Sequence, residues 1–174
     1  ACRSLGQLRA AESVHPLMGA TSDPVALVRA AAVQALVAID NPIAHARMRE
    51  IILDDSSTNV VVHAIAALGR SSLDQDLNLL MNLSRSDDHE VVKAAARALK
   101  PYKAHRATAA LLGLLAHERW DVRWAAAEVL SERGDATALG PLEHSRTFEQ
   151  DALVRQILAQ AIERLRASVT STTD

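Results

Sequence analysis

A nine-residue apolar pattern recurs five times along this chain of 174 residues and limits what the chain can fold into. The copies read VRAAAVQAL, VVVHAIAAL, VVKAAARAL, VRWAAAEVL and VRQILAQAI, and they begin at Val28, Val60, Val91, Val122 and Val154. Successive copies therefore start 32, 31, 31 and 32 positions apart. Self-similarity at a fixed period of this length indicates a repeat protein, in which each unit packs against its neighbours.

A second, shorter apolar segment precedes each copy and completes the repeat. These segments cover residues 11–20, 42–53, 73–83, 106–117 and 136–145. Helix start signals separate them: Asp23 and Asn41 each precede a proline, and capping-box spacing begins at Ser72 and Thr147, with a looser version at Asp87. The repeat is therefore predicted to be helix–turn–helix, with a first helix A and a second helix B.

Composition favours an all-α fold. Hydrophobic residues make up 49% of the chain but aromatic residues only 2%, so alanine, leucine and valine carry the apolar share. Alanine and leucine are the best helix formers, and most residues that favour strands are sparse. Six glycines and five prolines are too few for the many turns of a β-sandwich or β-barrel.

Two stretches, DPVALVRAAAVQAL (23–36) and WDVRWAAAEVLSERGDATALGPL (120–142), resemble the HEAT-like repeat. The similarity is to the short form named after phycobilisome lyases, with its aspartate, Val-Arg, alanine run and Ala-Leu. The resemblance implies a right-handed α-solenoid of about five hairpins whose B helices line the concave side. Val61 and Val92 replace the arginine of the pattern, so any ladder of Asp–Arg bonds between repeats should be interrupted there.

The repeat register also predicts the domain organisation. We expect one repeat domain over residues 1–167, with a polar, disordered tail at 168–174. Leu5 falls where the last leucine of an earlier B helix belongs, so residues 1–8 should end an earlier repeat of a longer protein. The five repeats should lie near residues 9–40, 41–70, 71–101, 102–134 and 135–167.

The charge and the cysteine content bear on partners and compartment. A net charge of −2 gives no strong overall field toward nucleic acid or membranes. The longest apolar run, at 107–116, is about half the length needed to span a bilayer, so no membrane association is expected. Cys2 is the single cysteine and cannot form a disulfide within the chain, which is typical of a reducing compartment and predicts a cytoplasmic protein.

No residue pattern predicts an enzyme. HEAT-like repeats include a di-iron hydroxylase with His-Glu motifs, but His89-Glu90 and His117-Glu118 start two and five residues before their repeat valines and should not converge. We therefore expect no metal, cofactor or small-molecule substrate. No serine sits in a glycine-flanked elbow, and no glycine-rich phosphate loop occurs. The resemblance leaves a bilin-lyase-like or chaperone role as an alternative.

A basic stretch over residues 93–106 is the basis of a second alternative, nucleic-acid binding. It contains Lys93, Arg97, Lys100, Lys103 and Arg106. Phosphate binding needs several cations that converge on one surface, and the cations after Lys100 fall in a turn. We therefore rank nucleic acid below a protein partner.

The two tryptophans are the strongest functional signal. Trp120 and Trp124 lie four apart and should share one face of a B helix. A large aromatic pair among small and charged residues is typical of an interaction hot spot. We predict a scaffold or adaptor module that binds a protein partner on the concave face, with these anchors and the flanking residues Lys93, Arg97, Arg123 and Gln156.

Overall fold

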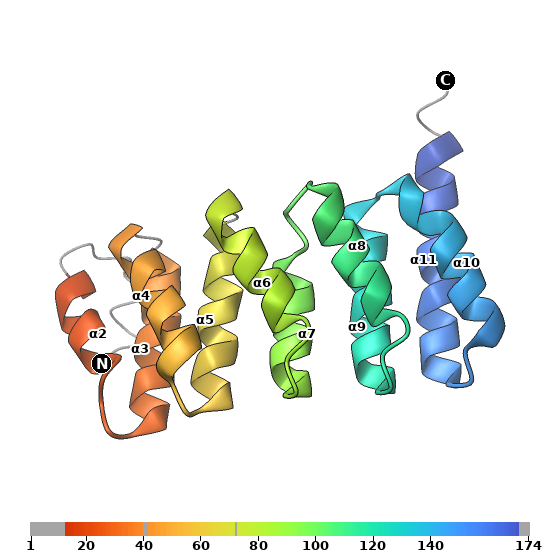
Figure 1. Ribbon diagram of the computed structural model, residues 1–174. Helices are drawn as coiled ribbons and strands as arrows, with labels where there is room; N and C mark the ends of the chain where they lie inside the picture. Colours follow the sequence, from red (N-terminus) through yellow and green to blue (C-terminus); the bar gives the residue numbers. More distant parts are fainter. Residues whose placement is uncertain (1–12, 40–41, 72, 171–174) are drawn as a thin grey trace. The chain divides into compact units, whose positions relative to one another are not determined.

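The computed structural model describes residues 13–39, 42–71 and 73–170, and the regular elements in these ranges are all helices. They form five helix–turn–helix hairpins in chain order (Figure 1). The all-α helical repeat fold predicted from the sequence period is therefore confirmed. Crossing a bilayer takes a long, continuously apolar helix, and the described part of the chain contains none.

The hairpins pack into two compact units, where the repeat register predicts one domain. The boundary lies between Leu73 and Asp74, which is also the boundary between the second and third repeats. Unit 1 contains α2 (Val14–Ala20), α3 (Ala26–Ile39), α4 (Pro42–Asp54) and α5 (Thr58–Ser71). In unit 1, α3 packs against α2 and α5, and α4 packs against α5.

Unit 2 contains the other three hairpins and most of the residues that bear on function. Its helices are α6 (Leu77–Leu83), α7 (His89–Ala98), α8 (His105–Leu114), α9 (Trp120–Arg133), α10 (Leu139–Phe148) and α11 (Ala152–Thr170). Short 3-10 turns, η2 (Asp74–Asp76) and η3 (Ala136–Ala138), precede α6 and α10. The B helix α9 packs between the B helices α7 and α11, while each B helix also packs on its own A helix (Figure 1).

The repeated apolar positions fill the cores of both units. The ninth position of every copy is fully buried, at Leu36, Leu68, Leu99, Leu130 and Ile162. The first-position valines are also buried except Val28, in the first hairpin, which is partly exposed. Alanines between them are buried as well, and three in a row on α9, Ala125–Ala127, have no exposed surface. Their small side chains let neighbouring helices approach closely, and burial of the larger apolar positions stabilises the stack.

Two predicted helix caps lie elsewhere than expected. The Asp87 and Thr147 spacings are not used; Asp88 and Asp151 instead accept a backbone N–H two residues further on, at 2.9 and 2.8 Å. Thr147 lies inside α10, which continues to Phe148, because the A helix is longer than its apolar pattern. At the predicted start at Asp23, the carboxylate accepts the Val25 N–H at 2.8 Å, but α3 itself begins at Ala26.

The C-terminal boundary also differs from the prediction. Helix α11 continues to Thr170, so residues 168–170 of the predicted disordered tail are helical. The Ser168 hydroxyl donates to the Leu165 carbonyl at 2.7 Å, which satisfies this polar side chain within the helix. The rest of the predicted tail, residues 171–174, lies outside the described residues, as do residues 1–8, Asn41 and Ser72.

Candidate binding surface

The three B helices of unit 2 carry a set of exposed and partly exposed side chains, here named the B-helix face of unit 2. Lys93 bonds Asp121 at 2.8 Å and Lys100 bonds Glu132 at 2.9 Å, which connects the α7 hairpin to α9. Between α9 and α11 lies a hollow of about 340 Å³. The face comprises Lys93 and Arg97 on α7, Trp120, Trp124, Glu128 and Glu132 on α9, and Leu153, Gln156, Ile157, Gln160 and Arg164 on α11.

The tryptophans occupy successive turns at the start of α9. Trp120 is 47% exposed and Trp124 is partly buried. Other side chains fill the core positions of the same helix: Val122 and Leu130 have no exposed surface. Neither indole is therefore a fully buried core residue, and the pair covers the outer surface of the helix.

The start of α11 adds an aliphatic pair to this surface that the sequence analysis did not select. Leu153 is 55% exposed, and Ile157, one turn later, is partly exposed and lines the hollow between α9 and α11. Helix α11 packs directly against α9. The N-terminal ends of two adjacent B helices therefore carry large apolar side chains. A signal was present in the sequence, since Leu153 and Trp120 lie one and two residues before their repeat valines.

The C-terminal half of the face is charged. Burial raises the pKa of Glu128, while the Arg97 guanidinium opposes that shift. Glu128, Ser131 and Glu132 line the hollow on the α9 side, and Gln160 and Arg164 line it on the α11 side. The face therefore passes from apolar side chains at the helix starts to polar side chains one or two turns further along.

Lys93 is tied into a local ion-pair network. Its ammonium group lies 2.8 Å from Glu90 Oε1 and 2.8 Å from Asp121 Oδ2. Burial alone would lower the pKa of Lys93, but the hydrogen bonds with Asp121 and Glu90 outweigh it, and the pKa is raised. The Arg119 guanidinium, 3.0 Å away, and Lys93 together lower the pKa of the Asp121 carboxyl. The lysine is therefore charged and fixes the first turn of α9 to α7.

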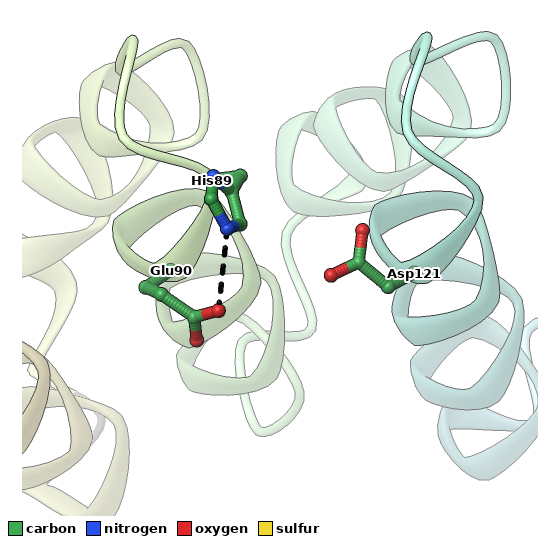
Figure 2. A group of neighbouring side chains, drawn as sticks. All are labelled: His89, Glu90 and Asp121. Atoms are coloured by element: carbon green, nitrogen blue, oxygen red, sulfur yellow. Dashed lines mark ion pairs between the residues drawn. The ribbon is translucent and has the colours of Figure 1, made fainter.

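The side chains of His89, Glu90 and Asp121 lie close together (Figure 2), although the sequence predicts that the His89-Glu90 and His117-Glu118 pairs do not converge on each other. One ligand atom from each lies within 4.8 Å of the others, and His89 Nε2 is 3.4 Å from Glu90 Oε1. The second pair, at His117, contributes nothing to this group. However, the Lys93 ammonium already bonds both carboxylates. A metal ion would have to displace it, so the group fits an ammonium better than a divalent cation.

A family model described as HEAT repeats matches residues 1–69 and 79–163, which is most of the chain. The chain belongs to the HEAT repeat family. No protein with a curated description matches the sequence.

Several solved structures share this HEAT repeat fold. The complex of CpcE and CpcF of phycocyanin lyase from Nostoc sp. PCC7120 contains a chain that is 19% identical, with a TM-score of 0.71 over 87% of this chain and 99% of that one. An engineered protein is 21% identical, with a TM-score of 0.57 over 95% and 90% of the two chains. Human deoxyhypusine hydroxylase is 19% identical, with a TM-score of 0.59 over 95% and 66%. At these identities the likeness concerns the fold alone.

Within the HEAT repeats, Arg123 belongs to a bridge between hairpins rather than to the B-helix face. Its guanidinium bonds both carboxylate oxygens of Glu149 at 2.7 and 2.8 Å, and donates to the carbonyls of His117 and Glu118 at 2.9 Å each. Its side chain is only 16% exposed. All this bonding capacity is used for packing, so Arg123 is unsuited to the flanking role predicted for it.

The same bridge occurs in unit 1 at the equivalent positions. Arg29 bonds both oxygens of Asp55 at 2.7 and 2.8 Å and donates to the Asp23 carbonyl at 3.0 Å. Each bridge joins residues 26 apart, so it connects one HEAT repeat to the next. Val61 and Val92 stand at the position of the arginine, and a valine side chain cannot form such bonds, so the predicted ladder of Asp–Arg bonds is interrupted there. Beside Val92, the Lys93–Asp121 ion pair makes a different connection between repeats.

Proposed function

We propose that this HEAT repeat protein is a scaffold or adaptor module that binds a partner protein through the B-helix face of unit 2. The observation that carries the proposal is the half-exposed Trp120 one turn before Trp124 on α9, with the exposed Leu153 at the start of the adjacent helix α11. Large aromatic side chains surrounded by polar ones dominate the binding energy of protein interfaces. Stacked helical repeats also offer an extended surface that is ordered before binding, which reduces the entropic cost of association.

The flanking polar residues have different roles in this proposal. Arg97 and Gln156 are exposed and free to contact a partner directly. Lys93 acts through its ion pairs, since it holds Asp121 and thereby the first turn of α9, on which Trp120 lies. Arg123 acts one step further away, by holding the α8–α9 turn to the end of α10. The directly contacting set is therefore the two tryptophans, Leu153, Arg97 and Gln156.

Nucleic-acid binding through residues 93–106 has less support. Lys93 bonds Glu90 and Asp121, and Lys100 bonds Glu132 at 2.9 Å. Arg97 lies close enough to Glu128 to oppose the rise in its pKa. Phosphate contacts gain free energy by releasing counterions from nucleic acid, and Lys93 and Lys100, which are already paired with carboxylates, offer little of that gain.

A lyase-like or chaperone role rests on fold likeness to the phycocyanin lyase chain alone. A hollow of about 500 Å³ beside Phe148 and His144 has room for a ligand, but the Arg123 guanidinium in its wall is bound to Glu149. This hollow therefore offers no uncommitted guanidinium for an acidic chromophore. Binding of a partner protein remains the function that the described side chains support best.

Site-specific photo-crosslinking tests the proposal. A benzophenone amino acid at position 120 is compared with the same residue at Arg146, an exposed position on the A helix α10, in extracts of cells that make the protein. We expect a protein adduct at position 120 that is absent at position 146. The adduct should disappear when Trp124 and Leu153 are replaced by alanine in the chain that carries the crosslinker.

Two outcomes would count against the proposal. Identical adducts from positions 120 and 146 would mean non-specific contact. An adduct at position 120 that survives replacement of both Trp124 and Leu153 would mean that the apolar side chains do not anchor the partner. Thermal melting of each variant separates loss of binding from loss of folding.

A further inference from the structure

The A-helix side of unit 2 has a small hollow between α6 and α8 that the proposed function does not use. Its volume is about 190 Å³, and its lining consists of Met81, Arg85, His105, Arg106, Ala109 and Ala110. Arg85 follows α6, whereas Arg106 lies in the first turn of α8. Two arginines from different hairpins therefore meet at one hollow, and its walls contain no carboxylate among the described residues.

The two arginines of this hollow, like Arg97 on the B-helix face, bond no carboxylate among the described residues. The guanidinium groups of Arg85 and Arg106 are exposed, and neither makes a hydrogen bond or ion pair within the described residues. By contrast, Lys93, Lys100 and Arg123 all bond carboxylates. The chain as a whole has a net charge of −2, so uncompensated positive charge at one hollow is a local feature.

Arg106 lies in the first turn of α8, a position where a positive charge destabilises the helix. The B helices α7 and α9 have an acid in the first turn, Glu90 and Asp121, whereas the A helices α2, α4, α6 and α10 have none there. Helix α8 has no acidic residue in its first turn and no side-chain cap, and carries Arg106 there instead. A cation at a helix N-terminus is disfavoured by the helix dipole. Sequences tend to break such local rules where another role requires the residue.

The floor of the hollow limits the ligand chemistry. Met81, Ala109 and Ala110 make the apolar part of its lining, here called its floor, and the two alanines are small enough to leave space for an aliphatic side chain. A phosphate backbone would make no use of that floor, and nucleic-acid binding needs more converging cations than this hollow supplies. A protein segment that carries carboxylates beside aliphatic side chains matches both the rim and the floor.

We propose that the α6–α8 hollow is a second docking site, which binds an acidic segment of a partner protein. Aspartate or glutamate side chains of the segment pair with Arg85 and Arg106, and a leucine or methionine side chain enters the hollow over Met81 and Ala109. The site lies on the A helices, so it is independent of the B-helix face of unit 2. A scaffold with two such sites holds two segments at once.

Fluorescence anisotropy of the full chain tests the inference with defined probes. The main probe is a fluorescein-labelled peptide of repeated Glu-Leu-Leu-Glu units; matched peptides replace glutamate with glutamine or leucine with serine. We expect binding of the first peptide only. The double substitution Arg85→Glu and Arg106→Glu should weaken it about tenfold or more, because two attractive pairs become repulsive.

The control is Arg146→Glu with Arg155→Glu, which reverses two other exposed arginines of unit 2. It should change the affinity by less than about twofold, as expected for surface charges outside the site. Equal losses in both double variants would overturn the inference, as would absence of binding by the acidic peptide. Equal binding of the glutamine peptide would also refute it, and so would an oligothymidylate that competes with the acidic peptide at physiological salt. If reversal lowers the melting temperature, Arg85→Gln with Arg106→Gln gives the same comparison.

Discussion

Replacement of Trp120 by alanine distinguishes an interface anchor from a core residue, with Leu130→Ala on the same helix as the internal standard. Trp120 is 47% exposed, so truncation removes about half of the burial that a core tryptophan would lose. A fully buried tryptophan covers up to about 250 Å², which leaves roughly 100–130 Å² at this site. At about 25 cal/mol per Å² the upper bound is about 3 kcal/mol, and residual burial in the unfolded chain, roughly 10–40%, reduces it to about 2–2.5 kcal/mol.

Leu130 gives the contrasting magnitude. It has no exposed surface, and its truncation should cost about 2–5 kcal/mol because a cavity remains in the core. Urea unfolding followed by far-ultraviolet circular dichroism measures both variants without relying on tryptophan fluorescence. The smaller loss for Trp120→Ala should accompany a loss of partner affinity of about 2 kcal/mol or more. A loss of stability at Trp120 equal to that at Leu130 would refute the reasoning, since it would make the indole a core side chain.

The remaining predictions concern charges. Replacing Glu149 by glutamine should cost about 1–2 kcal/mol at neutral pH, between exposed and buried pairs, since its side chain is 6% exposed and that of Arg123 16%. Because the Arg123 guanidinium lowers the pKa of Glu149, this contribution is present above the ordinary pKa of 4.5 and is lost as the pH falls through the lowered folded value; a pH series of urea midpoints checks the sign. In the Lys93→Ala variant no ammonium group bonds Glu90 and Asp121, so zinc should bind there and raise the melting temperature. In the unmodified chain the ammonium bonds both carboxylates, and zinc should leave the melting temperature unchanged. Oligonucleotides should bind no more tightly than the non-specific range of about 10⁻⁴ to 10⁻⁶ M at physiological salt, and steeply salt-dependent binding well below that range would favour the nucleic-acid alternative.

The hairpins could be predicted from the sequence because each copy repeats the same burial pattern. Val122 and Leu130 are buried in α9 for the same reason that Val91 and Leu99 are buried in α7. The boundaries were less predictable. A capping residue is chosen by local backbone geometry, so Asp88 caps α7 although Asp87 has the expected spacing to Glu90.

The candidate surface depended on contacts between repeats, which periodicity alone does not give. The tryptophan pair was evident from its spacing, but Leu153 belongs to another hairpin, and it is the packing of α11 on α9 that brings the starts of the two helices to one surface. The bridging role of Arg123 could not be predicted for a similar reason. Its partner Glu149 lies 26 residues away, and only the folded repeats bring the two together.

The ion pairs that connect the hairpins of unit 2 have a consequence for local unfolding. Lys93–Asp121 joins the third hairpin to the fourth, and Arg123–Glu149 joins the fourth to the fifth. A stack of repeats with weak interfaces opens one hairpin at a time from its end, whereas strong neighbour coupling makes the stack open together. Hydrogen exchange of the α11 amides should therefore follow that of α9 rather than proceed as independent fraying, and protonation of Glu149 at low pH should release the last hairpin first.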